Sequence, residues 1–73
     1  MNADVGLLLR KMRMKRGFTQ PQLAKRLGLS ASTVSRMEKG RIGVQVQDLL
    51  NWVKTTNGQE LLIAFLCNAD VIT

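Results

Sequence analysis

The side chains that most often carry out catalysis are nearly absent from this sequence. It contains no histidine and a single cysteine, Cys67. These residues supply neither a nucleophile with its base nor a set of zinc ligands, and no glycine-rich loop is spaced to hold a nucleotide phosphate. A single cysteine cannot form an internal disulfide either, which fits a reducing compartment. We therefore expect no enzymatic activity, no metal and no cofactor.

Small polar side chains and one arginine instead gather on a predicted helix, residues 30–39. Val34 and Met37 are expected to face inward there. Within this helix, Glu38 is the first acidic residue. The outward positions hold Ala31, Ser32, Thr33, Ser35, Arg36 and Lys39. A helix with such a face has little to bury, and a DNA major groove about 12 Å wide admits one helix. Binding to DNA is therefore the chemistry that these residues favour.

The chain is strongly basic, and its charge is unevenly distributed. Eleven Lys and Arg against five Asp and Glu give a formal charge of +6. Residues 1–41 carry ten cations and two acids, whereas residues 42–73 carry one cation and three acids. The basic part predicts a surface for a polyanion, and the mildly acidic part predicts a surface for something else. The alternative is an ordinary basic surface that is simply solvated.

Hydrophobic spacing, caps and glycine stops predict four helices before the Asn57-Gly58 break. The expected helices span 3–16, 19–27, 30–39 and 45–56. Thr19 begins the second helix, and Gln22 three residues later completes the spacing of a capping box. A tight glycine-containing turn joins the second and third helices, which is the pattern of a helix-turn-helix. In the fourth helix the residues expected to face inward are Val46, Leu49, Leu50 and Val53, with Trp52 on a flank.

The segment 59–67 fits two kinds of structure. As a strand, it would place Leu61, Ile63, Phe65 and Cys67 on one face and Leu62, Ala64 and Leu66 on the other. Both faces would be apolar, so the strand would need cover on both sides. As a helix, it would form one stripe of Leu61, Leu62, Phe65 and Leu66. Periodicity does not decide between the two.

A longer pattern in residues 5–58 resembles a known family. It comprises Arg13, Gly17-Phe18-Thr19-Gln20, Leu23-Ala24, Gly28, Val34-Ser35 and Met37-Glu38-Lys39-Gly40. This pattern is similar to that of the lambda-repressor-like (Xre) family of prokaryotic DNA-binding domains. The resemblance implies a compact bundle of four or five helices whose third helix, here residues 30–39, enters the major groove.

The same resemblance implies which residues contact the bases. The matching positions in the family that contact base edges are Ala31, Ser32 and Arg36, with Thr33 and Ser35 adding base or phosphate contacts. Arg36 is the best candidate for a guanine, because its guanidinium fork matches the O6 and N7 acceptors. Ser32 can donate or accept and discriminates less, and Ala31 suits a thymine methyl group.

Other positions of the family pattern imply backbone contacts and a structural ion pair. The residues expected at the DNA backbone are Thr19, Gln20, Lys39 and Arg41. The alternative for Lys39 and Arg41 is plain solvation. Gln20 is expected to donate to a phosphate from the start of the second helix. In the family, the positions of Arg13 and Glu38 form a salt bridge between the first helix and the end of the third helix, which enters the major groove. That pairing would keep Glu38 from repelling phosphates.

The stretch from Glu60 to Ala69 is similar to the C-terminal strand of HipB-type antitoxins, which pairs with its copy across a dimer. The likeness implies a dimerisation strand formed by Leu61, Leu62, Ile63, Phe65 and Leu66. It also implies a HipA-like kinase toxin as a possible partner. The alternative for this segment is an ordinary part of the core.

Together these patterns predict an all-α, compact four-helix lambda-repressor-like domain with a short C-terminal β-strand used in dimerisation. Residues 1–58 would form the helix-turn-helix domain, and residues 59–73 its dimerisation strand and tail. The expected function is a homodimeric transcriptional repressor on an inverted-repeat operator, autoregulating a toxin–antitoxin operon. The alternatives are an antitoxin-type interaction module that neutralises a toxin, and a phage-type repressor without one.

The expected location is the prokaryotic cytoplasm, either the cytosol or the nucleoid. Asp4 and a basic first helix replace the apolar region of a signal peptide. The longest apolar run, Leu61 to Cys67, is far shorter than the roughly 20 residues of a membrane span. We therefore expect double-stranded DNA and a second copy as partners, and no membrane.

Overall fold

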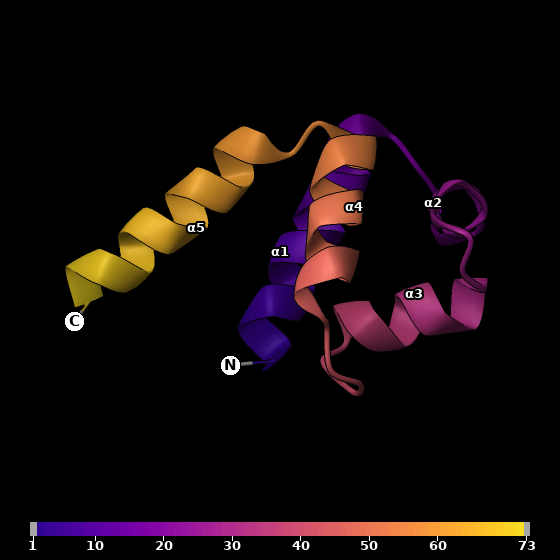
Figure 1. Ribbon diagram of the computed structural model, residues 1–73, viewed down its shortest axis with the longest axis horizontal. Coiled ribbons are helices and arrows are strands. Elements are labelled where there is room, and N and C mark those ends of the chain that lie inside the picture. The colour runs from indigo at the N-terminus through magenta and orange to yellow at the C-terminus, as the bar shows by residue number, and fades with distance from the viewer. Residues whose placement is uncertain (1, 73) are drawn as a thin grey trace.

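The computed structural model describes the backbone of residues 2–72 and the side chains of residues 4–67. The described backbone is all helical, with no strand between residues 2 and 72 (Figure 1). Its helices are α1 (Asn2–Arg16), α2 (Gln20–Leu27), α3 (Ala31–Glu38), α4 (Val46–Thr56) and α5 (Gln59–Ile72). The all-α prediction is therefore confirmed, whereas the expected number of helices, four, is too low.

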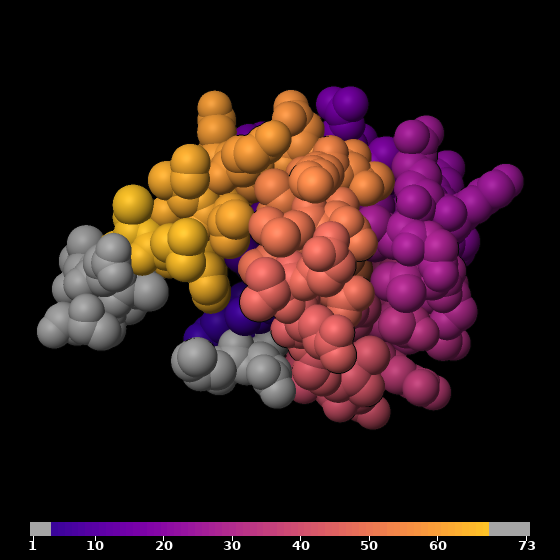
Figure 2. All heavy atoms as spheres, viewed as in Figure 1, coloured from indigo at the N-terminus to yellow at the C-terminus, as the bar shows by residue number. Residues whose placement is uncertain are grey.

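The first helix holds the others together. α1 packs against α3, α4 and α5, and α2 packs against α3 and α4. In Figure 1, α2 and α3 lie on one side of the α1–α4 pair, and α5 extends away on the other side. The space-filling view shows the same division, with α4 between the α2–α3 side and α5 (Figure 2). The helix-turn-helix and the C-terminal helix are thus on opposite sides of the molecule.

The start and end of α2 follow from local chemistry. The Thr19 hydroxyl accepts a hydrogen bond from the Gln22 amide at 3.2 Å, and the Thr19 amide donates to Gln22 Oε1 at 2.9 Å. Two amides that lack helical partners are satisfied in this way. Gly28 ends the helix in the left-handed conformation, with φ of 71°, which costs glycine little. The predicted capping box and glycine stop are both confirmed.

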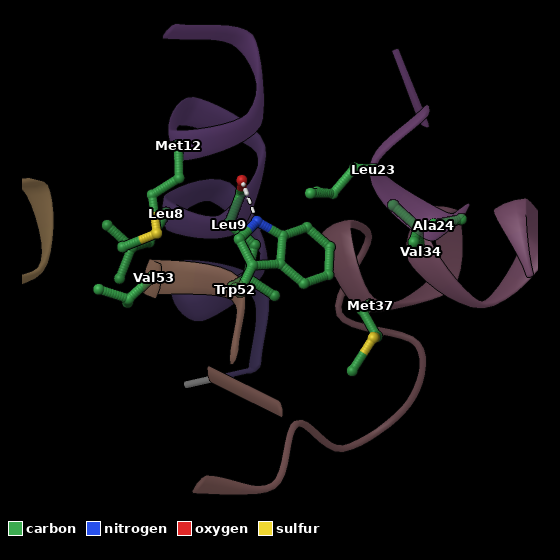
Figure 3. Packing of buried hydrophobic residues seen from close by; sticks show 9 residues of the cluster. All are labelled: Leu8, Leu9, Met12, Leu23, Ala24, Val34, Met37, Trp52 and Val53. Carbon is green, nitrogen blue, oxygen red and sulfur yellow. Dashed lines mark hydrogen bonds between the residues drawn. The ribbon is translucent and has the colours of Figure 1, made fainter. Parts of the chain in front are cut away.

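Trp52 lies at the centre of the core, which corrects its expected place on a flank. Its side chain is fully buried, and Nε1 donates to the Leu9 carbonyl of α1 at 3.0 Å (Figure 3). The buried hydrophobic residues of the cluster are Leu8, Leu9, Met12, Leu23, Ala24, Val34, Met37, Trp52 and Val53. Val46 and Leu50, expected inside, are 74% and 42% exposed. Burying the large indole ring, with its N–H paired, sets the rotation of α4.

The strand expected over residues 59–67 is wrong, because this segment belongs to α5. Asn57 closes α4 with a left-handed φ of 55°, and the Leu62 amide then donates to the Gly58 carbonyl at 3.0 Å. Leu62 packs against the core together with Leu61 and Phe65. That spacing matches one face of a helix. A helix also satisfies its backbone within the segment, whereas a strand needs another strand beside it.

The N-terminal part of α1 approaches the end of α3 so closely that it needs a glycine. A Cβ placed on Gly6 would overlap the Glu38 carbonyl oxygen and lie 2.9 Å from the Met37 carbonyl oxygen. Both neighbours are backbone atoms and cannot turn aside as a flexible side chain would. Gly6 therefore sets the distance between α1 and α3.

We expect Gly6→Ala to destabilise the fold by about 2 kcal/mol. Alanine favours a helix by about 1 kcal/mol over glycine, but overpacking costs about 1–3 kcal/mol and here forces two helices apart. Gly43→Ala is the control, because a Cβ there has no neighbouring atom within 4 Å. Chemical denaturation measures both changes. A Gly6→Ala protein as stable as the control variant would show that the α1–α3 contact yields easily.

Candidate nucleic-acid interface

Local capping fixes the turn between α2 and α3. After Gly28, the Leu29 amide donates to the Ala24 carbonyl at 2.9 Å, which ties the turn to the end of α2. Ser30 then caps α3, since its hydroxyl accepts from the Thr33 amide at 3.1 Å. The two helices therefore form a short, well-defined helix-turn-helix.

The two sides of α3 differ sharply in character. Val34 and Met37 are buried, which fixes the rotation of the helix against the core. Ser32, Arg36 and Lys39 are exposed and follow one another at helical spacing along the opposite side. The partly exposed residues on the flanks of this stripe are Ala31, Thr33 and Ser35. The structure thus brings the predicted base-contact residues onto one outward surface.

Thr33 differs from the others in that its hydroxyl already has a partner. Its Oγ1 lies 2.9 Å from Ser30 Oγ, within the cap of α3. Ser32 and Arg36 make no hydrogen bond through their side chains within the described part of the chain. Their polar groups are therefore available for a ligand, whereas the Thr33 hydroxyl also serves the helix end.

Glu38, the acid of this segment, is buried and paired with Arg13. Arg13 Nε lies 2.6 Å from Glu38 Oε2, and Nη2 donates to Oε1 at 3.1 Å. The remaining guanidinium nitrogen, Nη1, donates to the Phe18 carbonyl at 2.9 Å. The two side chains are only 12% and 3% exposed. The arrangement is a bidentate pair that removes a negative charge from the outward surface of the helix.

Gln20 joins this pair, a contact that sequence reasoning missed. Its amide Nε2 donates to Glu38 Oε1 at 3.1 Å, across 18 positions of sequence. Nothing local in the sequence indicates a contact over that separation. The amide has a second N–H, so Gln20 can still donate to a phosphate while it remains bonded to Glu38. Thr19 is exposed beside it, with its hydroxyl used as the cap of α2.

The other two predicted backbone contacts follow the end of α3. Lys39 and Arg41 are both exposed. Between them, Gly40 takes a left-handed φ of 71°, and the Arg41 amide donates to the Arg36 carbonyl at 2.9 Å. This turn keeps both cations close to the end of the helix that carries Arg36.

The predicted dimerisation residues divide into two groups on α5. Leu61, Leu62 and Phe65 are partly buried against the core of their own domain. Ile63 and Leu66 are 59% and 53% exposed. An apolar surface remains at this end of the molecule, but on a helix rather than on a strand.

Among the residues that the structure describes, no three metal-ligating side chains form a group that could hold a metal ion. No described helix is both long enough and apolar enough to cross a membrane.

A family model for the helix-turn-helix domain matches residues 4–62, which is most of the sequence. The chain belongs to the helix-turn-helix domain family. No curated protein matches it.

Two solved structures have the same fold as this helix-turn-helix domain. One is the clp gene regulator ClgR from Corynebacterium glutamicum, with 24% identity and a TM-score of 0.79 over 96% of this chain and 77% of that one. The other is a point mutant of the restriction-modification controller protein C.Esp1396I. It has 23% identity and a TM-score of 0.75, over 89% of this chain and 93% of that one. At these identities the likeness concerns the fold alone.

We expect Arg13→Met to destabilise this helix-turn-helix domain by roughly 3 kcal/mol. The change keeps the apolar stem but leaves the buried Glu38 carboxylate without its cation, which is far costlier than losing an exposed pair. Arg10→Met is the control, because Arg10 is an exposed arginine on the same helix. A double-mutant cycle with Glu38→Gln, followed by thermal unfolding, measures the coupling. A coupling energy close to zero would contradict a structural role for the pair.

Proposed function

We propose that this protein is a sequence-specific DNA-binding transcriptional repressor that reads the major groove with α3. The observation that carries the proposal is the distribution of charged side chains between the two sides of this helix. Glu38 is buried against Arg13, while Ser32, Arg36 and Lys39 are exposed on the other side. The outward surface can therefore approach a polyanion without a carboxylate in the way.

The side chains on this surface suit the readout of base edges. Arg36 can donate two hydrogen bonds to O6 and N7 of a guanine, and Ser32, one helical turn before it, can bond to any base edge. Ala31 offers a methyl group for a thymine methyl, and Thr33 and Ser35 lie at the flanks for further base or phosphate contacts. Base preference would therefore depend most on Arg36.

The expected phosphate contacts surround this helix in the sequence. Thr19 and Gln20 are at the start of α2, where the helix dipole favours an anion. Lys39 and Arg41 follow α3 and are exposed. Contacts of this kind orient the helix on the duplex and carry no sequence information by themselves.

A homodimer would give the protein its specificity. One short helix reads only a few base pairs, whereas two copies on an inverted repeat read half-sites about 34 Å apart. Ile63 and Leu66 are exposed on α5 and provide an apolar surface for a second copy. α5 itself lies on the side of the molecule away from α2 and α3 (Figure 1). A two-fold contact between two α5 helices would take the place of the strand pairing that we first expected.

The names of the two structural neighbours support a regulatory function, since one is a gene regulator and the other a controller protein. A bound dimer represses by occupying its operator. The expectation of a toxin–antitoxin operon and of a HipA-like toxin rested on the likeness of residues 60–69 to the C-terminal strand of HipB-type antitoxins. This segment belongs to α5, so the likeness gives those two functions no support and our proposal is limited to repression.

We expect Arg36→Ala to lower affinity for the cognate site by about 1–3 kcal/mol and to relax preference at one base pair of each half-site. Arg41→Ala is the matched control, because it removes an equal charge beside the helix. It should weaken binding to all sequences about equally. Affinities for a panel of single-base variants of the site measure both. If the two variants lost affinity in the same uniform way, α3 would not be the helix that reads the bases.

Replacing Ile63 and Leu66 together by Glu should convert the protein to a monomer and weaken operator binding strongly. Charged side chains in an apolar contact are costly, whereas these two positions are exposed in the single chain and tolerate the change there. Val46→Glu serves as control, because Val46 is another exposed apolar residue and lies on α4. Sedimentation equilibrium measures the association. A double variant that remained dimeric would place the interface elsewhere.

A further inference from the structure

A basic groove lies between the end of α1 and the outer side of α2. Its volume is about 560 Å³. The residues that line it are Arg16, Gly17, Phe18, Gln22, Lys25 and Arg26. None of these residues is acidic, and Arg16, Lys25 and Arg26 are all exposed. The groove is thus a concave surface with three positive charges and no carboxylate in its lining.

One of the three cations is held in place. The Arg26 guanidinium carbon lies 5.0 Å from the centre of the Phe18 ring, within the range of a cation–π contact. This contact restricts the side chain before any ligand arrives, so less conformational entropy is lost on binding. A guanidinium restricted in this way is well suited to a phosphate, which accepts two of its hydrogen bonds.

The groove borders one of the expected backbone contacts. Thr19 lies between two lining residues, Phe18 and Gln22, and is joined to Gln22 by the capping box. Gln20 follows at the start of α2. A DNA strand that contacts Thr19 and Gln20 through one phosphate therefore runs beside the groove.

We propose that this basic groove binds a backbone phosphate of the DNA that flanks the half-site read by α3. The inference rests on the proposed function. It extends the length of DNA that the protein contacts beyond the bases that α3 reads. The groove would add affinity without adding base preference, because phosphates carry no sequence information. It would also make binding more sensitive to salt, since each neutralised phosphate releases counterions.

The test compares the full-length wild type with Arg16→Gln/Lys25→Gln. Both residues are exposed, and Arg26 with its Phe18 contact is left intact. Arg10→Gln/Lys11→Gln is the matched control, because it removes the same charge from exposed positions of α1 outside the groove. Each protein is titrated against two duplexes, the selected site with about ten base pairs on each side and the same site trimmed to its specified base pairs.

On the long duplex, the groove variant should lose about 0.9 from the slope of log affinity against log salt, the value expected for one phosphate contact. Its affinity loss between about 50 and 200 mM salt would then be about 3.5-fold smaller than that of the wild type. Base preference should stay the same, and the difference should disappear on the trimmed duplex. The control variant should keep the wild-type slope on both.

Three results would overturn the inference while leaving the proposed function intact. The groove variant could keep the wild-type slope on the long duplex, the control variant could change as much, or the difference could persist on the trimmed duplex. A wild type that selects no DNA sequence would instead overturn the proposed function itself. The two failures are therefore distinguishable.

Discussion

The ion pair between Arg13 and Glu38 connects the parts of the molecule that DNA binding requires. The Arg13 guanidinium reaches from α1 to the end of α3 and also holds the Phe18 carbonyl in the turn before α2. Gln20 donates to the same carboxylate from the start of α2. Because the pair is largely buried, it has a fixed geometry that an exposed pair would lack. Three helices therefore meet at one carboxylate, and the outward surface of α3 is left free of negative charge.

Other contacts of α1, to α4 and to α3, support this arrangement. Trp52 fills the centre of the core and bonds to the α1 backbone, so α4 is fixed in rotation (Figure 3). Gly6 allows α1 and α3 to approach more closely than any side chain would permit. A chain of 73 residues buries a modest core, and a contact between copies through α5 would add to it. Folding and DNA binding thus depend on the same few contacts to α1.

Features that depend on neighbouring residues were predictable from the sequence. Thr19, Gln22 and Gly28 mark the ends of α2 through hydrogen bonds that span a few positions, and the structure contains them as expected. Contacts between distant residues were not predictable in this way. The burial of Trp52 depends on how α4 rotates against α1, and the Gln20 contact depends on how two helices cross.

The C-terminal segment is a second case in which the spacing of residues did not determine the structure. Its apolar residues fit a strand and a helix equally well by spacing alone. The choice depends on whether Leu61, Leu62 and Phe65 reach the core of their own domain, which they do. A structure was also needed to show that Ile63 and Leu66 remain exposed on α5. The predicted positions on α3 came from a family pattern, and the structure adds that they share one outward surface.

Selection of bound duplexes from a random DNA pool by the full-length protein tests the central claim most directly. The account predicts an inverted repeat with half-sites centred about 34 Å apart, one helical turn, and a strongly preferred G·C pair in each half-site for Arg36. Enrichment of no sequence, or of a single site without two-fold symmetry, would contradict it.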